Sequence, residues 1–203
     1  MDVPVVPFGK PRGERADAAR NREHLLATVR AMIAEDGPEK VTMDALAERA
    51  GLGKGTVFRR FGTRAGIFRA VLDDAEHRFQ EQVLYGPPPL GPGADPRERL
   101  IAYGSGRISL LRSNHAVVRA AMDRSGTPAA AVSMSPAHIR MLLRQADPPL
   151  PHSDHLALQL AAALEGPLML YLTSEEVAGP AGESDCGRLA DSWRTLVERL
   201  FNG

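Results

Sequence analysis

Residues 41–64 read VTMDALAERAGLGKGTVFRRFGTR, and this stretch predicts two short helices joined by a tight turn. Thr42 is a favourable N-cap, and apolar residues follow it at helical spacing. After the glycine-containing turn at residues 51–53, a second helix is expected at residues 54–61. Two short helices around such a turn are typical of a helix-turn-helix, whose second helix lies in the DNA major groove.

The charge pattern around this stretch favours DNA as the partner. From Arg49 to Leu72 the chain carries six Lys or Arg residues and no Asp or Glu, although the net charge of the whole chain is +0. Val57 and Phe61 are expected to face the core, so the other side chains of the second helix point to solvent or phosphate. These outward residues are Lys54, Thr56, Arg59 and Arg60. A plain αα-hairpin within a helical bundle is the alternative.

Helical periodicity extends in both directions from this stretch. A helix is expected at residues 17–35, and a long helix runs from a Thr63 cap towards Leu84. Residues 86–96 contain eight Gly or Pro, a break that no helix crosses. Beyond this break, helices are expected at residues 96–113, 115–124, 136–145, 154–174 and 185–201.

The predicted fold is all-α, with an N-terminal three-helix helix-turn-helix DNA-binding domain and a C-terminal helical domain for ligand binding and dimerisation. The expected boundaries are a flexible basic arm at 1–16, the DNA-binding domain at 17–80 and the C-terminal domain at 81–203. No apolar run reaches the ~18 residues that a membrane span needs, and the N-terminus lacks a signal-peptide pattern. A cytoplasmic protein without a membrane partner is therefore expected.

From about Asn21 to Asp73 the chain resembles the tetracycline-repressor (TetR) family of bacterial transcriptional regulators. The resemblance rests on the spacing of apolar, turn and cap residues in the first helix, in residues 41–61 and in Gly62-Thr63-Arg64. It covers about a quarter of the chain, and the remainder is similar in helix count and in an apolar Gly-Pro-Leu segment at 166–168. Family members usually carry Tyr where this chain has Phe58 and His where it has Arg60.

The resemblance implies a homodimer that binds a near-palindromic operator with two recognition helices ~34–36 Å apart. It also implies release of the double-stranded DNA by a small-molecule effector bound in the C-terminal domain. Base-edge contacts are expected from Lys54, Thr56 and Arg59, and phosphate contacts from Thr42, Arg60, Thr63 and Arg64. Phe58 completes the expected DNA-binding set, and Arg15, Arg20 and Arg22 are a candidate basic arm along the DNA.

The C-terminal domain offers less specific signals. An effector that is mostly apolar is expected to lie between its helices, against Tyr103, Met122, Met141 and Met169. The apolar stripes of the last two helices predict a dimer interface. Its expected residues are Leu164, Leu168, Leu189, Trp193 and Leu196. Burial of the same stripes within one protomer is the alternative.

Motifs for catalysis, metal binding or cofactor binding are missing from the sequence. Cys186 is the single cysteine, and neither a Gly-x-Ser-x-Gly nor a Gly-x-Gly-x-x-Gly motif is present. His152, Asp154 and His155 lie in a proline-rich loop and indicate a capped helix start rather than a metal site. We therefore expect a ligand-responsive repressor without enzyme activity, catalytic residues, metal or cofactor. The alternatives are a helical dimeric interaction protein that no longer reads DNA, or a small helical enzyme that uses the C-terminal cavity.

Overall fold

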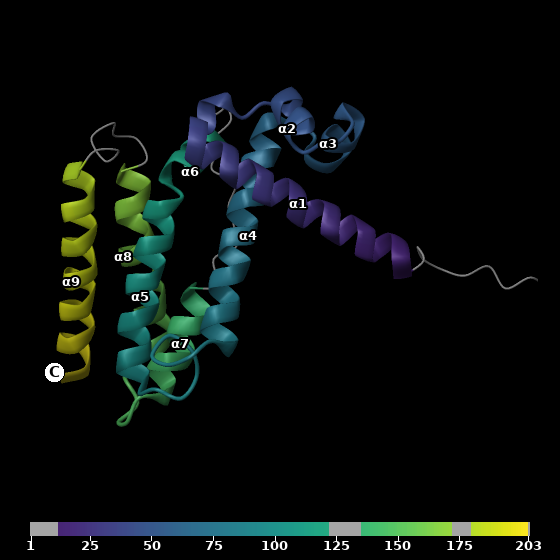
Figure 1. Cartoon of the computed structure of the whole chain (residues 1–203). Coiled ribbons are helices and arrows are strands. Elements are labelled where there is room, and N and C mark those ends of the chain that lie inside the picture. The colour runs from purple at the N-terminus through teal and green to yellow at the C-terminus, as the bar shows by residue number, and fades with distance from the viewer. Residues whose placement is uncertain (1–11, 122–134, 172–179, 203) are drawn as a thin grey trace, which may run out of the picture. The chain divides into compact units, whose positions relative to one another are not determined.

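The computed structural model describes residues 12–121, 135–171 and 180–202, and these residues form helices and connecting turns without a strand (Figure 1). An all-α fold is therefore confirmed. The expected arm falls largely on residues outside the described part of the chain. Within the described residues, no helix combines the length and the apolar character needed to cross a membrane.

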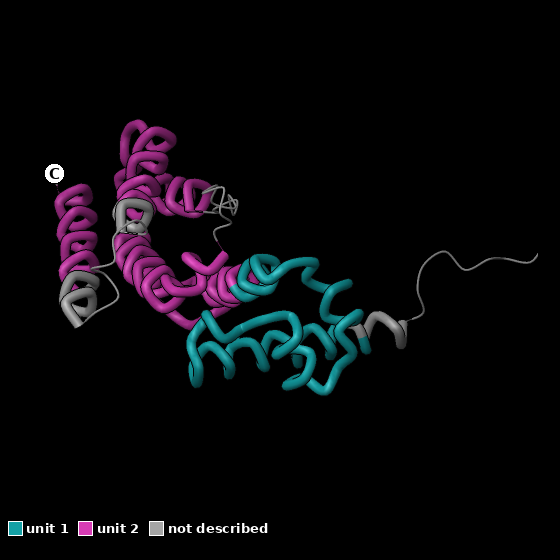
Figure 2. The backbone as a smooth tube through the Cα atoms, turned by 90° about the horizontal axis from the view of Figure 1, so that it is seen from above, with its two compact units in different colours: residues 1–71 teal, residues 72–203 magenta. Residues whose placement is uncertain are grey.

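The chain divides into two compact units, residues 1–71 and 72–203, which Figure 2 shows in different colours. The division lies inside α4, Arg64–Tyr85, whereas the sequence suggests a boundary after residue 80. The first turns of α4 pack in unit 1 through Ile67 and Phe68, both 0% exposed. Phe79 and Val83, nearer the end of α4, belong to the core of unit 2. One long helix therefore contributes to both cores.

Unit 1 is built from α1 (Arg12–Asp36), the 3-10 turn η1 (Pro38–Lys40), α2 (Met43–Arg49), α3 (Lys54–Phe61) and the first turns of α4. Two of the expected caps are confirmed, because the Thr42 hydroxyl accepts from the Ala45 amide at 3.1 Å and the Thr63 hydroxyl from the Gly66 amide at 3.0 Å. The core of the unit contains Leu25, Leu26, Val29, Val41, Leu46 and Val57.

Gly66 allows the end of α3 and the start of α4 to approach closely. A Cβ atom at this position would lie 1.9 Å from the carbonyl oxygen of Phe61. From sequence alone Gly66 only weakens α4, because glycine is a poor helix former. In the structure the missing side chain is what permits the tight connection from α3 into α4.

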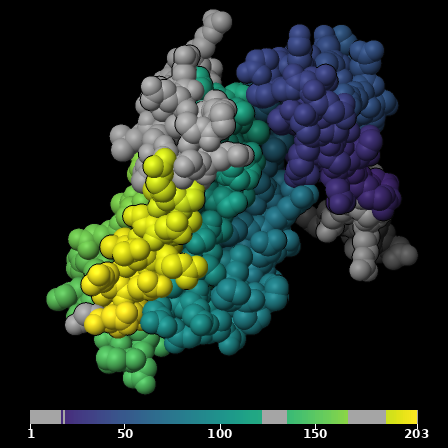
Figure 3. Space-filling view, turned by 60° about the vertical axis from the view of Figure 1, so that its left-hand side comes forward, coloured from purple at the N-terminus to yellow at the C-terminus, as the bar shows by residue number. Residues whose placement is uncertain are grey.

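Unit 2 contains α5 (Pro96–Ser113), α6 (His115–Ala121), α7 (Ser135–Gln145), α8 (Ser153–Tyr171) and α9 (Pro180–Asn202), in addition to the end of α4. Asp95 caps α5, with Pro96 at its first position. The longest packing surfaces join α5 to α9 and α7 to α8. Figure 3 shows α9 as a surface layer alongside residues of α5. The last two helices of the chain thus each have a different main partner within the protomer.

Candidate functional site

The relative placement of α2 and α3 is set by the turn between them. Gly51 adopts φ 65°, a left-handed conformation that glycine accepts without strain. The Leu52 amide then donates to the Ala47 carbonyl at 2.9 Å, which closes the end of α2. Val57 is 0% exposed and fixes which side of α3 faces the core. This arrangement is a helix-turn-helix with α3 as its second helix.

The outer face of α3 is cationic and carries an exposed aromatic ring. Lys54, Arg59 and Arg60 are exposed, and Thr56 is half-buried beside them. Phe58 is 64% exposed, an unusual position for a large apolar side chain. The predicted orientation of α3 is therefore confirmed for Val57 and for the three exposed cations, whereas Thr56 and Phe61 are both half-buried.

The acid-free run from Arg49 to Leu72 is not an acid-free surface. Arg49 donates to the carboxylate of Glu35 and lies 3.4 Å from that of Asp36, so α1 compensates its charge. The hydrogen bond to Glu35, reinforced by the charges of both acids, raises the pKa of Arg49. Lys54 Nζ lies 2.9 Å from Asp44 Oδ1 in an exposed pair. These ion pairs cannot be recognised from the sequence, because the acids lie on other helices than the cations that they pair with.

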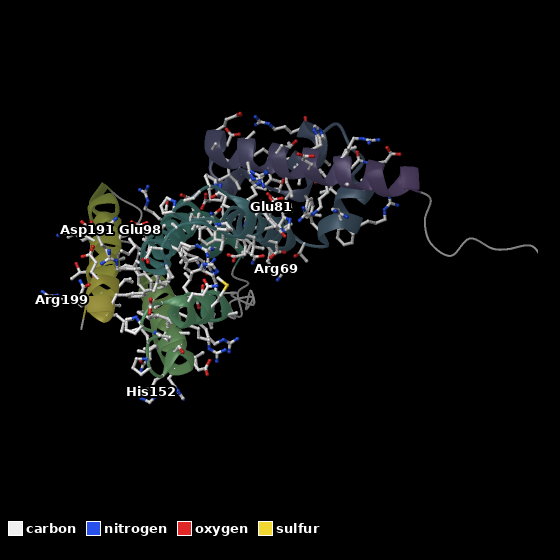
Figure 4. All side chains as sticks on the ribbon, turned by 90° about the horizontal axis from the view of Figure 1, so that it is seen from below. Arg69, Glu81, Glu98, His152, Asp191 and Arg199 are labelled. Atoms are coloured by element: carbon white, nitrogen blue, oxygen red, sulfur yellow. The ribbon has the colours of Figure 1, made fainter. Side chains whose placement is uncertain are left out.

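Arg59 and Arg60 are the cations of α3 that remain available to a partner. Arg59 contacts only the Thr56 hydroxyl, at 3.4 Å, and within the described part of the chain no carboxylate is within ion-pair distance of either arginine. Arg69 of α4 is also exposed, as Figure 4 shows. The basic face therefore has fewer uncompensated charges than the sequence count suggests.

Arg64 has a structural role in addition to its expected phosphate contact. Its guanidinium donates to the Val41 carbonyl and to the Pro38 carbonyl, each at 2.7 Å, and lies 4.8 Å from the ring centroid of Phe68. These contacts join the start of α4 to the segment before α2. Replacing Arg64 would therefore disturb the helix-turn-helix itself, and the phosphate contact stays a prediction.

The expected effector residues are not brought together by the described part of the structure. Tyr103 is buried, 3% exposed, in the core of unit 2. Met141 is 38% exposed on the outside of α7, while its neighbours Ile139 and Leu142 are buried. Met122 and the side chain of Met169 lie outside what the structure describes. Of the four residues, only Tyr103 has an established place in the interior.

Polar side chains gather around Tyr103 in a buried polar cluster that sequence reasoning missed. Tyr103 shares a hydrogen bond of 2.8 Å with Ser135, and its ring centroid lies 4.7 Å from that of His138. Arg107, one turn further along α5, pairs with Glu76 and lies 3.9 Å from Glu165. Burial is the main cause that raises the pKa of Tyr103. We define the buried polar cluster as Glu76, Arg99, Tyr103, Arg107, Ser135, His138 and Glu165.

His138 gives the cluster an expected pH dependence. Burial, followed by the charge of Arg99, lowers the pKa of His138 from its ordinary value of 6.5 to about 4. Between these values the unfolded chain binds a proton that the folded chain does not, so stability falls as the pH drops through this window. His138→Gln should remove this loss, which is at most ~3 kcal/mol between pH 6.5 and about 4, at 1.36 kcal/mol per pKa unit. Urea unfolding of both proteins across the window measures the difference, and parallel curves would contradict it.

The structure corrects two of the expected interface residues. Trp193 is 4% exposed and Leu164 is 3% exposed within a single protomer, so neither has surface left for a partner. Trp193 Nε1 donates to the Leu100 carbonyl at 3.0 Å, which anchors α9 to α5. Leu189 is half-buried against the same core, and the side chain of Leu168 is not described. Leu196, 45% exposed, is the expected residue that can reach a second copy.

The histidine-rich start of α8 is an ion-paired helix terminus. Asp154 Oδ1 and Oδ2 accept from Arg144 at 3.0 and 3.1 Å, and Arg140 lies 3.7 Å from Oδ1. His152 adopts φ 54°, and its side chain projects outward in Figure 4. The helix begins at Ser153, one residue before the expected start at 154, so His152 occupies the N-cap position and Asp154 lies in the first turn instead of the expected loop.

A sequence model described as bacterial regulatory proteins, tetR family, matches residues 25–71. This segment contains α2, α3 and the buried faces of α1 and α4 described above. The chain is also 33% identical over 73 residues to the DNA-binding transcriptional repressor TetR of Mycobacteroides abscessus. That match covers 36% of this chain and 36% of the relative, so the shared sequence spans about a third of the relative's length.

Two solved structures from Rhodococcus resemble the whole chain. A TetR-family transcriptional regulator from Rhodococcus sp. aligns with a TM-score of 0.57 at 18% identity, over 90% of this chain and 99% of that one. A TetR-like transcriptional regulator from Rhodococcus sp. RHA1 aligns with a TM-score of 0.55 at 20% identity, over 96% and 100%. At this identity the likeness concerns the fold, which extends through both units. Residues 25–71 are thus similar to the tetR family of bacterial regulatory proteins, and the fold of the whole chain is similar to that of two TetR-family regulators.

Proposed function

We propose that this protein is a transcriptional repressor that binds a near-palindromic operator as a homodimer and leaves it when a small molecule binds in unit 2. The observation that carries the proposal is the outer face of α3, where exposed arginines flank an exposed phenylalanine on the second helix of a helix-turn-helix. A cationic face attracts phosphate, and an exposed ring can contact a thymine methyl group. One relative is named as a transcriptional repressor, which supports repression rather than activation of transcription.

Within this proposal the side chains of the DNA-binding surface have two kinds of role. Lys54, Thr56 and Arg59 contact base edges, and Phe58 packs on the bases from the same face of α3. Arg60, Arg64, Thr42 and Thr63 contact phosphates. The hydroxyls of Thr42 and Thr63 accept backbone hydrogen bonds as caps, which leaves their protons available to a phosphate oxygen.

Arg59→Ala and Arg60→Ala should separate base reading from phosphate contact. Loss of a bidentate contact from Arg59 should cost ~1–3 kcal/mol and flatten the preference at one symmetric pair of operator positions. Loss of a phosphate contact from Arg60 should weaken all sequences alike and lower the salt slope of binding by ~1 per site. Duplexes selected from random DNA, followed by binding to every single-base variant of the selected site, measure both effects.

Arg194→Ala is the matched control for these two variants, because Arg194 is an exposed arginine of unit 2. It should leave both the preference profile and the salt slope unchanged. Affinity of the unchanged protein that does not fall with salt would contradict DNA binding and favour an interaction protein. A profile that changes with Arg60→Ala and not with Arg59→Ala would reverse the proposed orientation of α3.

The homodimer is proposed to form through the exposed faces of α8 and α9. Leu158 is 58% exposed on α8, and Ala162 is exposed one turn further along the helix. Leu196 is 45% exposed on α9. Apolar side chains on the outside of the last two helices suit a helix-packed interface between two copies.

Leu196→Glu should convert the dimer to a monomer, since a charge would be buried without a partner on both sides of the two-fold axis. Light scattering measures the mass directly. Gln82→Glu places the same charge on an exposed position of α4 and should leave the dimer intact. A Leu196→Glu protein that remains a dimer would place the interface elsewhere, and Leu158→Glu then tests α8 by itself.

Release by a ligand requires that the ligand prefers the conformation that does not bind DNA. A coupling free energy of ~1–3 kcal/mol would change operator affinity ~5–150-fold. Turnover of the bound small molecule, rather than its recovery unchanged, would favour the helical enzyme instead of the repressor. Recovery of the ligand after release of DNA from the selected operator is therefore the decisive measurement.

A further inference from the structure

Two buried arginines that lie two turns apart on α5 differ in how their charges are compensated. Arg107 is 6% exposed and pairs with Glu76. Arg99 is 8% exposed, and among the residues that the structure describes no carboxylate pairs with it. Its Nη2 reaches the Val83 carbonyl at 3.5 Å, and its Nε has no hydrogen-bond partner. A buried cation without an anion costs several kcal/mol of stability, so Arg99 is expected to lower the free energy of unfolding of unit 2 when no anion is bound.

A second unpartnered polar group faces the same region of the cluster. His138 is 8% exposed, and its Nε2 atom has no hydrogen-bond partner in the described structure. The His138 ring lies against that of Tyr103, with centroids 4.7 Å apart, and Arg99 precedes Tyr103 by one turn of α5. His138 is neutral at pH 7, so Nε2 can donate a hydrogen bond to an anion beside Arg99 in the tautomer that carries the proton there.

We propose that Arg99 and His138 bind the carboxylate of a small apolar acid, and that this acid is the effector of the regulator. The inference rests on the proposed function and adds the chemical class of its ligand. A carboxylate supplies the single negative charge that Arg99 lacks and matches the planar fork of a guanidinium. It also accepts the hydrogen bond that His138 Nε2 does not make in the unliganded chain.

The charges and the apolar residues around this pair narrow the ligand class further. Glu76 and Glu165 lie at Arg107, two turns further along α5, so the single charge of Arg99 is matched by one carboxylate rather than by a doubly charged phosphate. Leu100 follows Arg99 on α5, Ile139 and Leu142 lie within about one turn of His138 on α7, and all three are 0% exposed. An apolar body attached to one carboxylate therefore suits this part of unit 2.

A hollow on the surface beside α5 is a competing place for an acid. An open hollow of about 510 Å³ lies on a different face of α5, and Glu98, Ser105 and Arg194 are among its lining residues. Arg194 is exposed there, so an acid attracted by a surface arginine would bind in this hollow rather than at Arg99. Replacing each arginine by methionine distinguishes the two places with the same chemical change.

The test uses the full-length protein and a series of straight-chain acids from hexanoate to dodecanoate, with benzoate and phenylacetate, each beside its neutral primary amide. At least one acid should raise the thermal unfolding midpoint of the unchanged protein, and its amide should not. Arg99→Met should weaken the binding of that acid by roughly 10–100-fold in Kd, measured by calorimetry, because a charged hydrogen-bond partner is lost. Arg194→Met should leave the Kd unchanged.

Four outcomes would overturn the carboxylate site: no acid of the series binds, acid and amide bind equally, Arg99→Met retains the affinity, or Arg194→Met abolishes it. Arg99→Met should fold normally, because removal of an unpaired buried charge relieves the unliganded structure. His138→Phe gives a second, independent variant that should weaken the acid and not the amide. Binding of the same samples to the selected operator is measured in parallel. Specific DNA binding without an acid response removes this site and leaves the proposed repressor standing.

Discussion

Trp193→Ala is expected to lower the free energy of unfolding by about 3–5 kcal/mol, a loss typical of a large aromatic removed from a packed core. Trp193 is 4% exposed, and its indole Nε1 donates to the Leu100 carbonyl at 3.0 Å. The change therefore leaves a cavity and removes a hydrogen bond between α9 and α5. Urea unfolding followed by circular dichroism measures the loss, and Ser192→Ala on the exposed side of α9 should change it by less than ~0.5 kcal/mol.

Gly104 provides a coupled test of the same contact. A Cβ atom on Gly104 would lie 2.0 Å from Trp193 Nε1, so Gly104→Ala should cost ~1–3 kcal/mol by overpacking. In the Trp193→Ala background the same change should cost little, because the clashing ring is gone. Additive losses would contradict the contact. If the free energy of unfolding lost in Trp193→Ala depended on protein concentration, Trp193 would instead belong to a dimer interface.

The helix-turn-helix could be predicted from sequence because its determinants are local. Thr42, Gly51 and Thr63 act within one turn of their own positions, through caps and a left-handed turn that residue type alone indicates. The expected second helix at residues 54–61 has the same bounds as α3 in the structure. The inner position of Val57 follows from helical spacing in the same way.

The charge compensation of this domain could not be predicted, because it depends on distant residues. Arg49 is paired by Glu35 and Asp36 of α1, and Arg64 is held by the Pro38 and Val41 carbonyls. A count of acids along the chain does not contain these contacts. These contacts compensate the charge of Arg49 and hold the guanidinium of Arg64, which is an expected phosphate contact, against unit 1 itself.

The buried polar side chains of unit 2 could not be predicted from the sequence for a different reason. Arg, Glu and His are surface residues by default, so Arg99, Arg107, Glu76 and His138 gave no signal of burial. Methionines, the expected pocket residues, are common core fillers and were a weak signal. Glu76 and Arg107 also lie on different helices, and only the packing of α4 against α5 brings them together.

Arg107→Met is expected to lower the free energy of unfolding by about 3 kcal/mol, the low end of the loss for a broken buried ion pair. The side chain of Glu76 is 20% exposed and that of Arg107 is 7% exposed, so water can relieve part of the stranded carboxylate's cost. Replacing both members of the pair, as Glu76→Leu with Arg107→Met, should restore most of the lost stability, because no uncompensated charge remains.

Arg99→Met is the matched comparison, since it makes the same substitution on the same helix at similar burial. It should leave the stability of the unliganded protein unchanged or raise it, because Arg99 has no carboxylate partner among the described residues. Chemical unfolding of the three variants without ligand gives the answer in one experiment. Equal losses for Arg99→Met and Arg107→Met would mean that both arginines support the fold. Unequal losses would separate the arginine that stabilises unit 2 from the arginine that is available to an anion.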